Sequence, residues 1–167
     1  MSITPAIAKK NVKRNKKYDD VINLLWIQGD AGQRDEKIFN NIKDIIIFAA
    51  MVGKKNEMRE SLDKADDVQG INLDTFSGSG SGKDSRVDQH NILFIFSLLQ
   101  HKDMNYMRDE KIDEIIAEFE EYSNGGLSII QGWLAESAYN PLCILDEMIN
   151  ITSSKKEGGV TITTNPF

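Results

Sequence analysis

At residues 119–127 the chain reads Phe-Glu-Glu-Tyr-Ser-Asn-Gly-Gly-Leu, with a helical pattern on each side. Apolar residues recur at helical spacing from Ile112 to Phe119, and a second amphipathic run begins at Leu127. The Asn-Gly-Gly triplet between them accepts positive φ angles, and helices commonly end on such residues. The sequence therefore predicts a sharp corner that joins two short helices, over residues 109–122 and 127–137.

This corner supports two interpretations. It fixes the angle at which two apolar faces meet, or it presents the bare backbone N–H groups of its glycines to an anion at the start of the second helix. The structural interpretation is the favoured one. A ligand or partner would meet the motif surface formed by Glu120, Glu121, Tyr122, Asn124, Gly125 and Gly126.

The bulk composition is that of a globular protein. The 167 residues suit one domain, and the fractions of apolar (40%) and charged (28%) residues are ordinary. No apolar run approaches the length of about 18 residues that crosses a bilayer, so no membrane contact is expected. The basic residues near the start precede no apolar signal region, and the single cysteine, Cys143, excludes an internal disulfide. These features favour the cytoplasm.

Charge is distributed unevenly along the chain. All 26 acidic side chains lie after residue 17, whereas residues 1–17 carry only basic ones. We expect residues 1–17 to form a flexible basic arm that is solvated, docks on the acidic body, or contacts DNA or a partner. The candidate contact residues are Lys9, Lys10, Lys13, Arg14, Lys16 and Lys17.

Helical periodicity dominates the rest of the chain and predicts a mainly α fold, a single compact helical domain of about five to seven helices. The domain is expected to span residues 18–152. Further helices are expected over residues 21–26, 35–52 (ending at Gly53), 92–99 as an apolar core helix, and from Pro141, with Leu142, Ile144, Leu145, Met148 and Ile149 on its inner side. Residues 71–76 alternate apolar and polar side chains, which predicts a short strand or extended loop.

Two segments read as irregular. Residues 77–85 are rich in Gly and Ser and predict a flexible loop. They are not a P-loop, because Asp84 stands where the magnesium-binding hydroxyl belongs. Residues 153–167 form a polar tail, within which residues 160–164 have strand propensity and could add to the edge of a partner's sheet.

No catalytic, metal or cofactor motif is recognisable, so the chain is more simply a non-enzyme. The helix over residues 109–122 nevertheless carries clustered carboxylates that could hold Mg²⁺ or Mn²⁺ in a nuclease. A solvated acidic face is the favoured interpretation. His90 and His101 lie eleven residues apart on one helix, about 16 Å along its axis, which is too far to chelate one metal ion together.

Three strings of residues resemble the family of DNA phosphorothioation (dnd) system-associated protein 4. They are Lys43-Asp-Ile-Ile-Ile-Phe-Ala-Ala-Met-Val-Gly-Lys54, Asp74-Thr-Phe76 and Phe119-Glu-Glu-Tyr-Ser-Asn-Gly-Gly-Leu127. The resemblance covers roughly residues 35–150 and leaves out the basic arm and the C-terminal tail.

The resemblance implies an accessory, non-catalytic subunit of a prokaryotic anti-phage defence system that places sulfur in the DNA backbone and restricts DNA lacking it. Its expected partners are the larger subunits of that complex and, through the basic arm, DNA. Two alternatives stay open. One is an acidic regulator that mimics DNA, and the other is a small metal-dependent nuclease subunit using carboxylates between Asp113 and Glu121. The sequence leaves the oligomeric state open.

Overall fold

The computed structural model describes residues 9–26, 38–76 and 91–153, the last three without their side chains. Its strands and α-helices are, in chain order, β1 (Asn11–Asn15), α2 (Asp19–Leu25), α3 (Ile42–Lys55), β2 (Val68–Asn72), α4 (Asn91–His101), α5 (Ile112–Glu136) and α6 (Cys143–Ser153). Short 3-10 helices link them: η1 (Lys16–Tyr18), η3 (Ala65–Asp67), η4 (Leu73–Phe76), η5 (Met104–Met107) and η6 (Asp109–Lys111). The predicted mainly α fold is confirmed.

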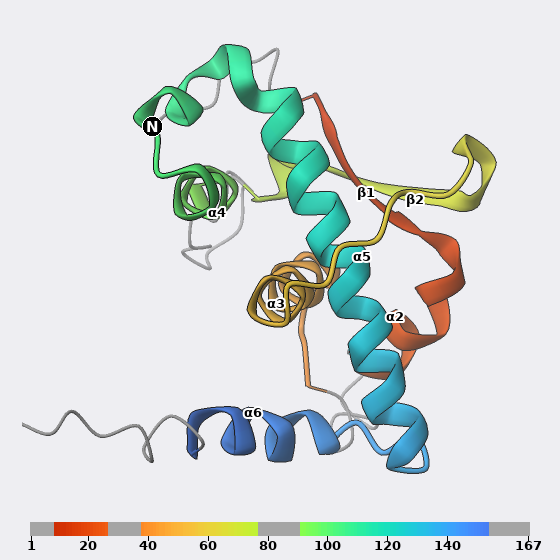
Figure 1. Cartoon of the computed structure of the whole chain (residues 1–167). Coiled ribbons are helices and arrows are strands. Elements are labelled where there is room, and N and C mark those ends of the chain that lie inside the picture. The colour runs from red at the N-terminus through yellow and green to blue at the C-terminus, as the bar shows by residue number, and fades with distance from the viewer. Residues whose placement is uncertain (1–8, 27–37, 77–90, 154–167) are drawn as a thin grey trace, which may run out of the picture.

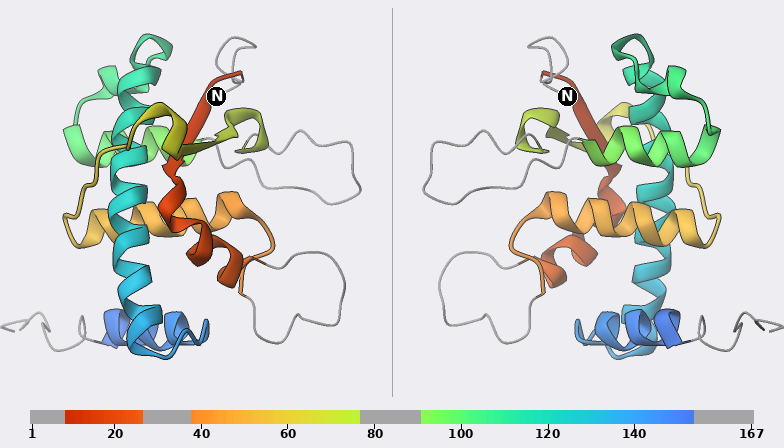
Figure 2. Two further views of the ribbon diagram at one scale, coloured as in Figure 1. Left: turned by 90° about the vertical axis from the view of Figure 1, so that its right-hand side faces the viewer. Right: turned by 90° about the vertical axis from the view of Figure 1, so that its left-hand side faces the viewer.

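Helix α5 is the axis of the molecule, as Figure 1 shows. Helices α3 and α4 cross it, one above the other, and α6 lies at its C-terminal end (Figure 2). The antiparallel pair β1–β2 and helix α2 cover its remaining side. The α5 side chains that face these neighbours are fully or almost fully buried: Ile115, Phe119, Leu127, Ile130 and Leu134.

The predicted corner at residues 124–126 is wrong, because α5 runs through it as one helix of 25 residues. The glycines serve the crossing with α3 instead. A Cβ atom on Gly126 would lie 1.8 Å from the carbonyl oxygen of Ala49, and one on Gly53 would lie 2.0 Å from that of Tyr122. The two helix backbones are therefore in direct contact, which offsets the usual cost of about 1 kcal/mol for a glycine within a helix.

The same contact places Gly53 inside a helix and not at its end. Gly53 was expected to end the helix before it, yet α3 continues to Lys55 and Gly53 is buried within it. After α3 the chain passes over the other side of α5, where a Cβ atom on Gly125 would lie 2.2 Å from the carbonyl oxygen of Met58. Gly125 and Gly126 thus let two different segments touch α5.

The N-terminal basic segment is not an arm from Asn11 onward. Strand β1 pairs with β2 in the register Val12 to Ile71, and the side chains of Val12 and Asn15 are buried. Only one of the five side chains of β1 is apolar, so the sequence shows no alternating pattern typical of a strand. The pairing strand β2 also lies more than 50 residues away in the sequence. Residues 1–8 lie outside the described residues.

The remaining helices agree with the sequence in part. Helix α2 is confirmed. Helix α3 starts at Ile42, later than predicted, because Phe39 forms a β-bridge with Trp26 instead. The strand expected near residues 71–76 ends at Asn72, and η4 follows. None of the described helices is both long and apolar enough for a bilayer.

Two helices are more peripheral than their apolar sequences predicted. Helix α4 was expected to be the core helix, but Ile95 and Leu99 on its outer face are 48% and 66% exposed. The inner side predicted for the last helix is wrong, because only Ile144 of the five apolar residues assigned to it is buried. The other four are 44–60% exposed: Leu142, Leu145, Met148 and Ile149. The predicted flexible loop (77–85) and the tail after residue 153 lie outside the described residues.

Candidate functional site

A pocket of about 330 Å³ lies where the start of β1 meets the N-terminal half of α5. It joins the basic segment to the acidic helix, two features that the sequence presented separately. Its walls are formed by Lys9, Lys10, Asn11 and Lys13 on one side and by Asp113, Ile116, Ala117 and Glu120 on the other.

Strand β1 is oriented by hydrogen bonds on both of its edges. The N–H of Leu73 donates to the carbonyl of Lys10 (2.8 Å). Because backbone groups alternate along a strand, the N–H and C=O groups of residues 10, 12 and 14 point toward β2. On the opposite edge, the N–H of Lys13 donates to Oε1 of Glu120 (2.6 Å) and that of Asn15 to Oδ1 of Asn124 (2.8 Å). By the same alternation, the N–H of Asn11 is the next in this row, and Asn11 lines the pocket.

Glu120 is the buried acid of the pocket, with 6% of its surface exposed. Burial raises its pKa to about 7, although the hydrogen bond from the Lys13 N–H and the positive charge of Lys13 both act to lower that pKa. The neighbouring charge of Glu121 raises the pKa further. Near neutral pH this carboxyl group therefore exists in both protonation states, as a group that can either accept or donate a proton.

The raised pKa predicts that ionisation of Glu120 opposes folding. Its carboxyl has an ordinary pKa of 4.5 in the unfolded chain and about 7 in the folded one. Between these values the folded chain holds a proton that the unfolded chain has released, so this contribution to stability falls as pH rises and levels off above about 7. At pH 8, Glu120→Gln should raise the free energy of unfolding by about 1–2 kcal/mol, with little gain at pH 4.

Urea denaturation at both pH values measures this difference. Glu114→Gln is the matched control, because Glu114 is an exposed carboxylate on the same helix that pairs with Lys111. An equal effect of Glu120→Gln at the two pH values would contradict the raised pKa.

The structure divides the six predicted contact residues into two groups. Lys9 and Lys13 are exposed at the pocket, and Lys10 pairs there with Asp113 (2.5 Å). The other three are engaged within the fold. Arg14 is buried and paired with Asp19, Lys16 donates to the carbonyl of Asp66 (2.6 Å), and Lys17 pairs with Glu60 (2.8 Å).

The expected motif surface is mostly internal. Tyr122 is buried, with Lys54 and Arg59 over its ring, and Asn124 is fully buried against β1. Glu121 is half-buried and accepts a hydrogen bond from Nε of Arg59 (2.8 Å). With its N–H groups inside a continuous helix, the Asn-Gly-Gly segment does not form the anion site that was the less favoured interpretation of this stretch.

Sequence reasoning missed the polar cluster that anchors β1. The Asn15 side chain is fully buried, donates to Glu60 Oε1 (3.0 Å) and the Ser61 carbonyl (3.1 Å), and accepts from the Asp63 N–H (2.8 Å). Tyr18 donates to Glu60 Oε2 (2.5 Å), and burial together with this bond raises the pKa of Tyr18 to about 12. Burial acts to raise the pKa of Glu60, but hydrogen bonds from Lys17, Tyr18 and Asn15 bring it below its usual value.

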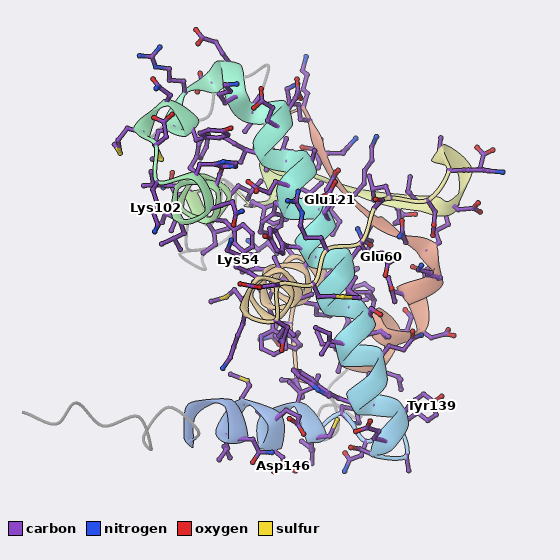
Figure 3. The ribbon with its side chains drawn as sticks, in the orientation of Figure 1. Lys54, Glu60, Lys102, Glu121, Tyr139 and Asp146 are labelled. Atoms are coloured by element: carbon purple, nitrogen blue, oxygen red, sulfur yellow. The ribbon has the colours of Figure 1, made fainter. Side chains whose placement is uncertain are left out.

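The segment between α3 and β2 brings Glu60 to this cluster. The Glu60 N–H donates to the carbonyl of Glu121 on α5 (3.0 Å), and Figure 3 labels both residues where the segment crosses that helix. No pattern in the sequence marks Asn15 and Glu60 as partners, since 45 positions separate them.

The other carboxylates in the N-terminal half of α5 contact Lys or His side chains. Asp113 pairs with Lys10, Glu114 with Lys111 (2.7 Å) and Glu118 with His101 (3.0 Å), whose ring stacks on Tyr106. Glu118 is buried, so the expectation of a solvated acidic face is wrong for Glu118 and Glu120. Across residues 9–26, 38–76 and 91–153, no three His, Cys, Asp or Glu side chains are placed to hold a metal ion. His90 lies outside these ranges.

Comparison with known proteins gives one clear result. The family model described as DNA sulphur modification system-associated protein 4 matches residues 11–164. The match is longer than the expected range of about 35–150 and includes β1, which the resemblance had left out. No curated protein and no solved structure matches the chain.

Proposed function

The chain belongs to the DNA sulphur modification system-associated protein 4 family, and from this premise we propose that it is an accessory, non-catalytic subunit of a phosphorothioation-linked defence system. It binds larger subunits of that system and contacts the DNA backbone through the pocket lysines. The observation that supports DNA contact is that Lys9, Lys10 and Lys13 line one pocket.

The charge distribution supports a contact of this kind. Phosphate contacts by lysine supply most of the sequence-independent affinity of a protein for DNA. The body of the chain is acidic, and the formal net charge is −6, so a duplex is repelled from most of the surface. A local group of lysines on such a body would dock DNA in one orientation.

The accessory role rests on the family and on the use of the carboxylates. Each of the five candidate carboxylates of a nuclease accepts a hydrogen bond or ion pair from the protein itself: Asp113, Glu114, Glu118, Glu120 and Glu121. These contacts give the acidic residues a structural role, so the nuclease alternative gains no support from their geometry.

Affinity purification from native cells tests the accessory role. The chain carries a tag at its C-terminus, and its partners are identified by mass spectrometry with and without nuclease treatment. Recovery of large subunits of a DNA sulphur modification system after nuclease treatment is the expected result. Recovery of the tagged chain alone would contradict the proposal.

DNA contact predicts a specific salt dependence. Replacing Lys9 and Lys13 with alanine should weaken binding to duplex DNA about tenfold and reduce the slope of log K against log salt by about two, because two phosphate contacts are lost. Fluorescence anisotropy between 50 and 200 mM salt measures both quantities. Lys55→Ala with Lys64→Ala is the control, since these lysines are exposed elsewhere. An unchanged slope in the pocket variant would contradict the contact.

A further inference from the structure

We propose that the pocket between β1 and α5 is a binding site for one phosphodiester oxyanion, and that the site takes up a proton on Glu120 when the anion binds. This inference rests on the proposed DNA contact and assigns it to particular atoms. The anion would accept hydrogen bonds from the Asn11 N–H, from the lysine ammonium groups and from the protonated Glu120.

The backbone of β1 provides a directed donor. The N–H groups of Lys13 and Asn15 are already paired with side chains of α5, at 2.6 and 2.8 Å. By the strand alternation the Asn11 N–H continues the same row, and Asn11 is one of the residues that line the pocket. Backbone amides are fixed by the sheet, so this donor is in place before a ligand arrives, whereas lysine side chains must be ordered on binding.

The charges that face the pocket explain why a proton is needed. Among the residues that line the pocket, the N-terminal segment contributes the basic residues Lys9, Lys10 and Lys13, and α5 contributes the acidic residues Asp113 and Glu120. Ile116 and Ala117 supply uncharged wall. With both carboxylates ionised, the surplus of positive charge is a single unit. Neutralising Glu120 doubles that surplus and removes a direct repulsion.

Glu120 is the carboxyl group that takes up the proton when the anion binds, because its side chain is held in place beside the pocket. Its Oε1 atom accepts the Lys13 N–H, and the side chain is buried. A proton would therefore sit on Oε2, which becomes a hydrogen-bond donor to the anion. Asp113 has a side chain that is 78% exposed and pairs with Lys10, so water screens its charge. Burial already raises the pKa of Glu120 to about 7, which makes proton uptake inexpensive near neutral pH.

The test uses the full-length chain and a thymidine dinucleotide as the phosphodiester probe. Its phosphate keeps a single negative charge between pH 6 and pH 8, so any pH dependence belongs to the protein. Two-dimensional ¹H–¹⁵N spectra follow the titration at both pH values. We expect saturable shifts of the Asn11 and Lys13 amide signals, with an affinity about tenfold higher at pH 6 because one adjacent negative charge is removed.

Variants separate Glu120 from the other carboxylates. Glu120→Gln keeps an acceptor for the Lys13 N–H but carries no charge. It should bind at pH 8 about as tightly as the unchanged protein does at pH 6, without pH dependence. Glu114→Gln, on the same helix but outside the pocket wall, should keep the full pH dependence.

Three results would overturn the assignment. They are equal affinity of the unchanged protein at pH 6 and pH 8, equal binding of an uncharged methylphosphonate dinucleotide, and tighter binding of inorganic phosphate than of the dinucleotide. The last would identify a free-phosphate site. A positive affinity purification without shifts in Asn11 and Lys13 refutes the pocket alone, whereas the expected shifts without recovered subunits refute the accessory role alone.

Discussion

Gly126→Ala is expected to destabilise the protein by more than about 4 kcal/mol, a large part of the total stability of a domain of this size. The added methyl carbon would lie 1.8 Å from the carbonyl oxygen of Ala49, and backbone atoms cannot turn aside as a side chain can. Helices α3 and α5 would have to separate, and the core between them, which includes Ile45, Ala49 and Leu127, would lose its packing.

The same helix contains a matched control for this substitution. Gly132 also lies within α5, but a Cβ atom there meets nothing within 4 Å. Gly132→Ala should therefore stabilise the protein by about 0.5–1 kcal/mol through helix propensity alone. Urea denaturation followed by circular dichroism measures both variants. A Gly126→Ala protein within about 1 kcal/mol of the unchanged one would show that the α3–α5 contact is looser than described.

Asn15→Ala is expected to cost about 3 kcal/mol of stability. The change removes three hydrogen bonds of a fully buried side chain and leaves the Ser61 carbonyl and the Asp63 N–H without that partner. Buried groups that lose a hydrogen bond cost about 1–3 kcal/mol each, which is why the effect exceeds that of an ordinary surface change. Asn105→Ala, at an exposed position, should change stability by less than about 0.5 kcal/mol.

This second variant also tests the link between the polar cluster and the pocket. Asn15 follows Lys13 on β1 by two residues, so a loosened strand should weaken phosphodiester binding even under conditions where the variant is folded. Amide signals of β1 that shift in Asn15→Ala but not in Asn105→Ala would support this link. Full stability of Asn15→Ala would mean that water replaces the lost partners.

The main features of the fold could be predicted where local pattern decides the structure. Helix α2 has its acidic residues in the first turn and its apolar residues at helical spacing, and it forms as expected. The Asn-Gly-Gly segment misled because the same residues serve two purposes. They can end a helix, or they can let another backbone approach it, and only the contact with Ala49, some 77 residues earlier, decides between them.

The candidate site could be predicted only as separate halves. The lysines and the carboxylates were both conspicuous, but nothing in the sequence pairs Lys13 with Glu120, 107 positions away. Glu118, Glu120 and Glu121 read alike in a run of acidic residues, yet each meets a different partner. Which carboxyl groups are buried depends on where α4 and β1 cross α5, and that is set by tertiary packing.

The docking of β1 on α5 also fixes the order in which a newly made chain can complete its fold. Synthesis runs from the N-terminus to the C-terminus, so the lysine-bearing strand is made before α5, and its anchor Asn124 is added 109 residues after Asn15. Contacts of such long range form slowly. Until α5 has been translated, the strand has neither Glu120 nor Asn124 to bind. The growing chain therefore exposes its basic residues without a pocket until α5 has been made, and the proposed anion site can form only after that point.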